Sequence, residues 1–186
     1  MAEEARTEER AERYAVGEKL GEGTFFVVRR GRDRRTGRAV VLKFLKPEFA
    51  PDEEVGRRLA DAAGRASRLA HPGLVRVLDF GEGDGGPFVV CEWRPGTSLR
   101  RKLAVEGRVE PRQALIWAAQ MARALAEVHA SWEAHGDVRP EHVVICGPEG
   151  AKLRDQLLSL PFLSHPALRE FWLNRSASYV APEVVQ

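Results

Sequence analysis

The chain has 186 residues, of which 44% are hydrophobic and 30% charged, and its formal net charge at pH 7 is only +2. This length suits one medium domain or two small lobes with a buried core. The balanced charge gives no basis for a nucleic-acid or membrane partner. No apolar run is long enough to span a bilayer and the N-terminus is not signal-like, so a cytoplasmic protein is expected.

Residues 1–13 alternate Glu and Arg and predict a charged tail. Strands are then predicted over residues 14–20, 26–33 and 38–45. The turn between the first two strands carries Gly21 and Gly23, which let the backbone approach a phosphate where a Cβ would obstruct it.

The next segment, residues 51–70, is predicted to be a helix because acidic residues occupy its first turn and apolar residues recur at helical spacing. Two more strands are predicted over residues 74–80 and 87–92. The predicted apolar stripe of the helix comprises Val55, Leu59, Ala62, Ala66 and Leu69.

A second long helix is predicted from Pro111 to about residue 130. Its predicted core-facing positions are Ala114, Leu115, Ala118, Met121, Leu125 and Val128.

After this helix comes His135-Gly136-Asp137-Val138-Arg139, followed by a short apolar strand that ends at Ile145. A carboxylate and a cation two positions apart on one loop suit a phosphoryl-transfer site. Such a site needs a base for a hydroxyl and a positive charge near the phosphate.

Taken in order, these segments resemble the motifs of eukaryotic-type (Hanks-type) bacterial Ser/Thr protein kinases. Residues 21–28 resemble the Gly-rich loop, and Lys43 resembles the strand lysine. Residues 135–142 resemble the H-R-D-x-K-P-x-N loop, and residues 155–157 resemble the D-F-G motif. Residues 176–183 resemble the T-x-x-Y-x-A-P-E ending. The resemblance implies an α+β, protein-kinase-like two-lobe fold. Residues 14–92 would form a smaller lobe of five antiparallel strands and one helix. Residues 93–186 would form the hinge and a mainly helical larger lobe, incomplete because the chain ends soon after the A-P-E motif.

The resemblance also implies ATP with Mg²⁺ or Mn²⁺ as cofactor. Asp137 would be the base, Arg139 and Lys43 would serve the phosphates, and Asp155 and His142 would hold the metal. The implied nucleotide-binding residues are Gly21, Gly23, Val28, Val41, Lys43, Glu92, Arg94 and Val144.

Several positions depart from the family pattern. Ala62 falls where the family has the glutamate that pairs with the strand lysine, His142 replaces Asn, Gln156 replaces Phe, Phe26 replaces the third glycine and Val41 replaces Ala. Kinases work mainly by positioning and electrostatics, and a displacement of about 1 Å can cost on the order of 100-fold in rate. A pseudokinase is therefore expected, one that binds nucleotide while phosphoryl transfer is impaired or lost and that has a regulatory or docking role.

Three alternatives remain. The first is a weakly active Ser/Thr protein kinase, and the second is a small-molecule phosphotransferase of the aminoglycoside type. The third is a non-enzymatic scaffold that docks a partner. A protein partner or substrate is expected, as is self-association through a larger-lobe surface left uncovered after Glu183.

Overall fold

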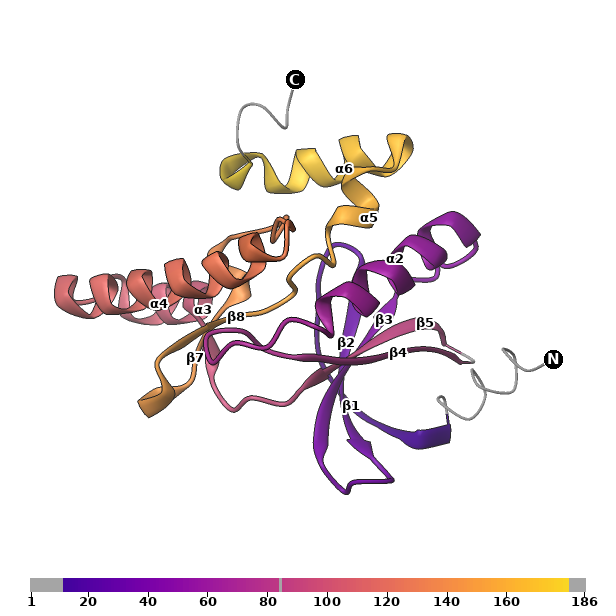
Figure 1. The fold of residues 1–186 in the computed structure, drawn as a ribbon, viewed down its shortest axis with the longest axis horizontal. Coiled ribbons are helices and arrows are strands. Elements are labelled where there is room, and N and C mark those ends of the chain that lie inside the picture. The colour runs from indigo at the N-terminus through magenta and orange to yellow at the C-terminus, as the bar shows by residue number, and fades with distance from the viewer. Residues whose placement is uncertain (1–11, 84, 181–186) are drawn as a thin grey trace. The chain divides into compact units, whose positions relative to one another are not determined.

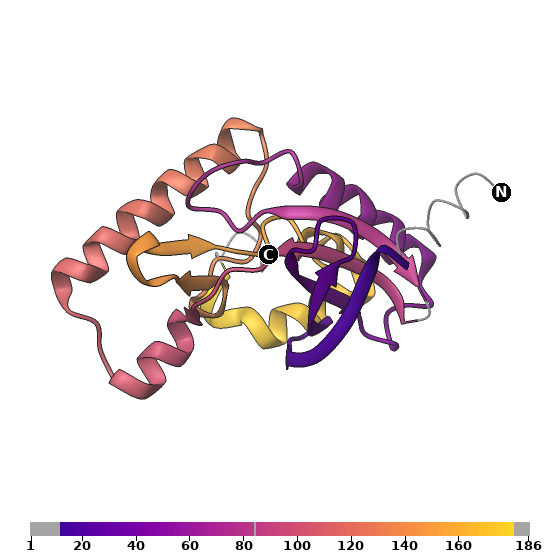
Figure 2. The same cartoon turned by 90° about the horizontal axis from the view of Figure 1, so that it is seen from below.

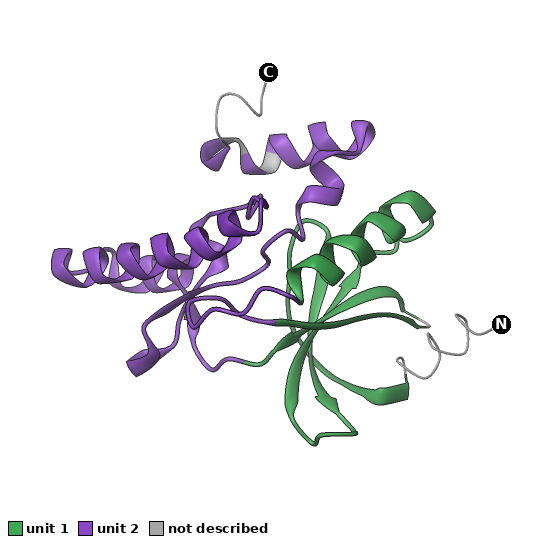
Figure 3. Ribbon diagram, in the orientation of Figure 1, with its two compact units in different colours: residues 1–67, 77–93 green, residues 68–76, 94–186 purple. Residues whose placement is uncertain are grey.

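The computed structural model describes residues 12–83 and 85–180. These residues form two compact units, unit 1 from residues 12–67 and 77–93, and unit 2 from residues 68–76 and 94–180 (Figure 3). Nearly all of the expected charged tail, and all of the expected A-P-E residues from Ala181 to Glu183, lie outside the described residues.

Unit 1 is an antiparallel sheet with the strand order β1-β2-β3-β5-β4, accompanied by the helix α2 (Figure 1). Its elements are β1 (Tyr14–Glu22), β2 (Phe26–Asp33), β3 (Ala39–Leu45), α2 (Glu53–Ala66), β4 (Val77–Gly83) and β5 (Gly86–Glu92). The five predicted strands and the predicted helix are all present. The helix is shorter than predicted at both ends, and β4 begins three residues later than expected.

The helix α2 forms where its sequence predicts it. The Asp52 side chain caps it by accepting hydrogen bonds from the main-chain N–H groups of Glu54 and Val55, at 3.0 and 3.1 Å. The predicted apolar stripe is confirmed, since Val55, Leu59, Ala62, Ala66 and Leu69 are all buried. The helix packs beside β4.

The register of the sheet determines which side chains share a face. Val28 of β2 lies directly opposite Lys43 of β3, and Val41 of β3 lies opposite Cys91 of β5. Side chains at directly opposed positions, and at alternate positions along one strand, point to the same face. Val28, Val41 and Lys43 therefore share one face. A cluster on the opposite face forms a core from Tyr14, Val40, Leu42, Phe88 and Val90.

Unit 2 combines a small sheet of order β6-β7-β8 with helices, and α4 packs along β8 (Figure 2). Its elements are β6 (Thr97–Ser98), α3 (Leu99–Glu106), α4 (Pro111–Ala130), η1 (Pro140–His142), β7 (Val143–Ile145), η2 (Gly147–Glu149), β8 (Ala151–Leu153), α5 (Leu160–Leu163), α6 (Pro166–Ser176) and η3 (Ala177–Tyr179). The segment 68–76 joins this unit through β8. There the Val75 N–H donates to the Leu153 carbonyl and the Leu153 N–H to the Gly73 carbonyl, each at 2.7 Å.

The prediction for the long helix is correct in its bounds and wrong for part of its packed face: Val128 is buried as predicted, whereas Ala114, Leu115 and Ala118 are exposed. The buried side chains of α4 are Trp117, Ala124 and Val128, whereas Leu115 is 72% exposed. Residues 114–126 are apolar on nearly every side of the helix, so periodicity alone does not select the face that packs. None of the helices in the described part of the chain is both long and apolar enough to cross a membrane.

A strained residue follows the end of α4. Trp132 has a φ of +58°, in the left-handed region that favours glycine, and its N–H donates to the His129 carbonyl at 3.0 Å. Its side chain is 98% exposed and therefore contributes almost no burial to offset the strain.

We expect Trp132→Gly to stabilise the protein by about 1 kcal/mol, because glycine adopts this conformation without a steric penalty. Denaturant unfolding measures the change. Leu157 provides the matched control because it also has a positive φ, +66°, but is completely buried. Leu157→Gly should destabilise the protein, since a lost leucine side chain costs about 2–5 kcal/mol. Equal effects of the two substitutions would contradict this account of strain.

Candidate active site

The loop that follows α4, residues 135–142, is joined to the segment after β8 by main-chain hydrogen bonds at both of its ends. The Leu157 N–H donates to the His135 carbonyl at 3.0 Å, and the Arg154 N–H donates to the His142 carbonyl at 2.9 Å. These bonds bring Asp155 beside the loop that carries Asp137. The residues predicted for the base and the metal therefore lie together in unit 2.

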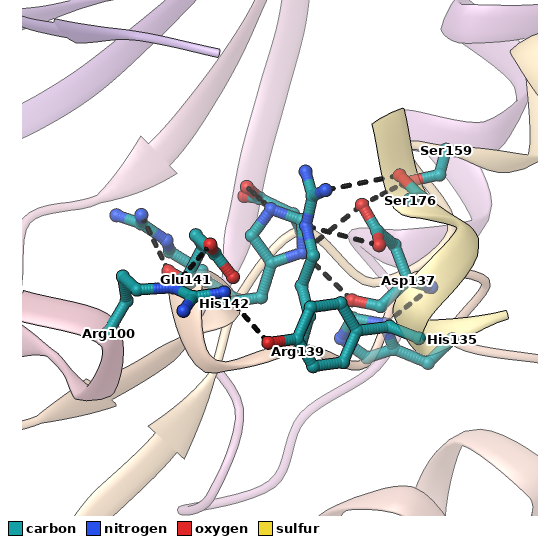
Figure 4. A network of polar contacts seen from close by, with 11 residues as sticks. Arg100, His135, Asp137, Arg139, Glu141, His142, Ser159 and Ser176 are labelled. Atoms are coloured by element: carbon teal, nitrogen blue, oxygen red, sulfur yellow. Dashed lines mark hydrogen bonds and ion pairs between the residues drawn. The ribbon is translucent and has the colours of Figure 1, made fainter. Parts of the chain in front are cut away.

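The Asp137 carboxylate is surrounded by three polar side chains (Figure 4). Arg139 Nε lies 3.3 Å from Oδ1, the Ser159 hydroxyl donates to Oδ2 at 3.3 Å, and His142 Nδ1 lies 3.4 Å from Oδ2. The Asp137 side chain is only 4% exposed. Both carboxylate oxygens are thus engaged within the protein.

Burial changes the protonation equilibria of the loop. It raises the pKa of Asp137 from 3.8 to about 6, against the opposing influence of Arg139. Burial also lowers the pKa of His135 to about 4, so this ring is neutral at pH 7. The ring orients the loop instead, because its Nδ1 accepts the Asp137 N–H at 3.3 Å. A carboxylate with a raised pKa, still ionised at pH 7, suits a general base.

The His142 ring lies between Asp137 and Asp155, and it is close to the carboxylates of both. Its Nδ1 is 2.8 Å from the main-chain carbonyl oxygen of Asp137, and its Nε2 is 3.6 Å from Asp155 Oδ2. Because a carbonyl only accepts hydrogen bonds, Nδ1 is the donor. In the neutral ring, the Nε2 lone pair then faces the Asp155 carboxylate. A nitrogen lone pair and a carboxylate oxygen repel each other at short distance, and a proton or a metal ion between them makes the contact favourable.

This pair has the composition of a metal site that a nucleotide would complete. Within residues 12–83 and 85–180, no three His, Cys, Asp or Glu side chains are grouped to hold a metal ion by themselves. Nucleotide-bound cations commonly take only one or two protein ligands, with phosphate oxygens and waters as the others. Asp155 and His142 fit that requirement, although the imidazole suits Mn²⁺ better than Mg²⁺.

The cation of the loop, Arg139, also contacts the end of α6. Its Nη1 donates to the buried Ser176 hydroxyl at 3.1 Å. Nearby, Arg100 of α3 donates to Glu141 Oε1 at 2.8 Å and to the Tyr179 hydroxyl at 2.7 Å. The segment from Ser159 to Tyr179 is therefore attached to the loop by side chains at its beginning and its end (Figure 4).

The residues predicted to bind nucleotide are divided between the units. Gly21, Gly23, Val28, Val41, Lys43 and Glu92 belong to unit 1, and Arg94 and Val144 belong to unit 2. Lys43 is 4% exposed on β3. The Gly23 N–H donates to the Phe26 carbonyl at 2.8 Å, which closes the turn expected to face phosphate. Arg94 pairs with Glu149 at 3.3 Å, and Val144 is buried on β7.

Ser159 is not among the residues that the sequence predicts for this site. The hydroxyl of Ser159 contacts Asp137 from 22 positions further along the chain. No local motif marks this serine. Its spacing of four residues after Asp155 is the one signal that links it to the loop.

A family model described as the protein kinase domain matches residues 14–186. The chain is 28% identical over 174 residues to a probable serine/threonine-protein kinase of Clostridium acetobutylicum, covering 94% of this chain and 26% of the relative. It is 32% identical over 176 residues to the serine/threonine-protein kinase PknA of Mycobacterium tuberculosis, covering 92% of this chain and 41% of the relative. The chain thus spans less than half the length of these curated relatives.

Solved structures show the same fold. The PknI kinase domain of Mycobacterium tuberculosis is matched with a TM-score of 0.71 and 27% identity, over 86% of this chain and 64% of that chain. A structure of Rad53 residues 1–466 in complex with AMP-PNP is matched with a TM-score of 0.75 and 24% identity, over 95% and 43% of the two chains. The expected α+β, protein-kinase-like fold is therefore confirmed.

The raised pKa of Asp137 predicts a pH-dependent effect on stability. Because the folded-state pKa is higher than the unfolded one, the corresponding stability is present below pH 4 and is lost as the pH rises through about 6. Asp137→Asn prevents this loss of stability, because the asparagine side chain does not ionise. The variant should be more stable than the parent by up to about 3 kcal/mol above pH 6 and by almost nothing near pH 4.

Denaturant unfolding of both proteins across this pH range measures the difference. His135 titrates in the same range with the opposite sign, but it is present in both proteins and cancels in the difference. A stability difference that does not change with pH would show that burial does not raise the pKa of the Asp137 carboxylate.

Proposed function

This chain belongs to the protein kinase domain family, and we propose that it is a pseudokinase that binds a nucleoside triphosphate together with a metal ion. Its phosphoryl transfer is impaired, and its role is regulatory or in docking a protein partner. One observation carries the proposal. His142 holds its Nε2 3.6 Å from Asp155 Oδ2, in a donor pair that suits a nucleotide-bound metal other than Mg²⁺.

Retained nucleotide binding is supported by the charge and backbone of unit 1. Lys43 lies in a buried position on β3, with Val28 and Val41 on the same face of the sheet. We assign Lys43 to the phosphates and the two valines to the base of the nucleotide. Gly21 and Gly23 leave the backbone of the turn between β1 and β2 open to a phosphate. Even an added Cβ at Gly21 would meet no other atom within 4 Å.

Impaired transfer is supported by the groups that replace the positioning residues of the family. His142 places nitrogen where an amide oxygen would serve Mg²⁺. Gln156 is completely buried and donates to the Val75 carbonyl at 2.9 Å, so a polar amide occupies the place of an aromatic ring. Ala62 is completely buried in the apolar stripe of α2, where the family has a carboxylate. Each change affects alignment, on which phosphoryl transfer depends.

A weakly active Ser/Thr protein kinase is the second candidate, favoured by the assembled loop. Asp137 has a pKa near 6, which suits a base, and Arg139 lies 3.3 Å from it. Under this alternative the chain transfers the γ-phosphate of ATP to a protein hydroxyl at a low rate.

Three single substitutions test nucleotide binding. Lys43→Ala should weaken ATP binding about 10-fold or more with or without a metal, because a charge-assisted phosphate contact is lost. Asp155→Asn should weaken only the metal-dependent part. Asp137→Asn should leave ATP binding nearly unchanged, because a general base acts on the reaction rate. Isothermal titration with and without Mn²⁺ measures all three. Equal affinities in the three variants, or no binding by the parent, would contradict the proposal.

The metal preference tests the role assigned to His142. In the parent, Mn²⁺ should strengthen ATP binding more than Mg²⁺ does. His142→Asn restores an amide oxygen, so the preference should shift towards Mg²⁺. His129→Asn is the matched control, since this exposed histidine lies on α4 and should not affect the preference. An unchanged ratio of Mg²⁺ to Mn²⁺ affinities in His142→Asn would remove His142 from the metal site.

A further inference from the structure

Ser159 occupies the N-cap position of α5, but its hydroxyl forms no hydrogen bond with that helix. It stands at the N-cap of α5, a position where serine usually accepts a hydrogen bond from the helix backbone, and it makes no such bond here. Its hydroxyl donates instead to Asp137 Oδ2 at 3.3 Å (Figure 4). The candidate base therefore already holds an aliphatic hydroxyl from its own chain.

We propose that Ser159 is the acceptor hydroxyl of this site, phosphorylated in cis by the nucleoside triphosphate that the chain binds. This inference rests on the proposed function and names the acceptor for the same site. A substrate serine must donate its hydroxyl hydrogen bond to the base, and Ser159 occupies that place on Asp137 Oδ2. A hydroxyl from another protein has to displace it.

The transfer is a balanced displacement. The Ser159 Oγ forms a bond to the γ-phosphorus, and the bond from that phosphorus to the β–γ bridging oxygen breaks. The nucleoside diphosphate leaves with the bonding electron pair, and the hydroxyl proton passes to Asp137 Oδ2. Arg139, 3.3 Å from the same carboxylate, supplies positive charge beside the new phosphate.

An intramolecular acceptor suits a site whose catalysis is impaired. An oriented group in the same molecule reaches effective molarities of about 10⁵ M or more, which offsets part of the loss in rate. One slow turnover per chain is sufficient to modify its own serine. Ser159 is only 7% exposed, and a modification from outside would have to reach a buried hydroxyl.

The first test examines the contact without nucleotide. The stabilities of Ser159→Ala, Asp137→Asn and the double variant form a cycle, and the two single effects should not add. The control cycle uses Ser164→Ala, because the Ser164 hydroxyl donates to the main-chain carbonyls of Leu160 and Pro161, at 3.0 and 3.3 Å. Additive effects in the Ser159 cycle would overturn the proposal.

The second test uses ATP with Mn²⁺. After incubation, intact-mass measurement should show one added phosphoryl group per chain, and fragmentation should place it on Ser159. The rate should not change when the protein is diluted, as expected for transfer within one chain. The phosphate should be lost in Ser159→Ala, should persist in Ser164→Ala, and should form about 10²- to 10⁴-fold more slowly in Asp137→Asn.

Titration of ATP into the same samples separates two failures. If the parent binds ATP and Ser159 stays unmodified, or if another serine is modified in its place, this inference is overturned and the proposed function stands. If the parent binds no ATP, the proposed function is overturned and the inference with it.

Discussion

The position of His142 between two carboxylates determines the chemistry of this site. Its Nδ1 donates to the Asp137 carbonyl oxygen, and this bond directs Nε2 towards Asp155. An oxygen ligand in the place of the His142 ring would bind Mg²⁺ readily, whereas an imidazole nitrogen binds it poorly. Because His142 contacts both Asp137 and Asp155, a change at His142 should alter both the proposed metal preference and the surroundings of Asp137. The proposal of impaired transfer with retained binding rests on this single residue more directly than on any other departure.

Several elements of unit 2 hold these groups in place before any ligand arrives. Main-chain hydrogen bonds from Arg154 and Leu157 fix the segment around Asp155 against the loop. Asp155 itself has a φ of +69°, a strained conformation of the kind found at functional sites. Gly136 has a φ of +85°, and an added Cβ there would come within 2.8 Å of the Leu160 side chain. A glycine is therefore the residue that lets α5 begin close to the loop, which in turn places Ser159 at Asp137.

The sequence predicted the parts of the fold that depend on local patterns. The strands of unit 1 and the buried stripe of α2 follow from alternation and helical spacing, and both are present. The predicted core-facing positions of α4 are wrong in part, since residues 114–126 are apolar on nearly every side of the helix and Leu115 is exposed. The motifs indicated Asp137, His142 and Asp155, which the fold brings together. They did not indicate the tautomer of His142 or the contact of Ser159, because both depend on hydrogen bonds between distant segments. The roles assigned to Lys43 and the other nucleotide-binding residues remain predictions.

The central claim is that His142 binds the metal that accompanies the nucleotide. Pulsed electron paramagnetic resonance of Mn²⁺ and ATP bound to the chain, labelled with ¹⁵N at histidine, tests it most directly. The account predicts a ¹⁵N coupling typical of a directly bound imidazole, together with phosphorus couplings from the nucleotide. Phosphorus couplings without the ¹⁵N coupling would contradict it, because the metal and nucleotide would then be bound without His142.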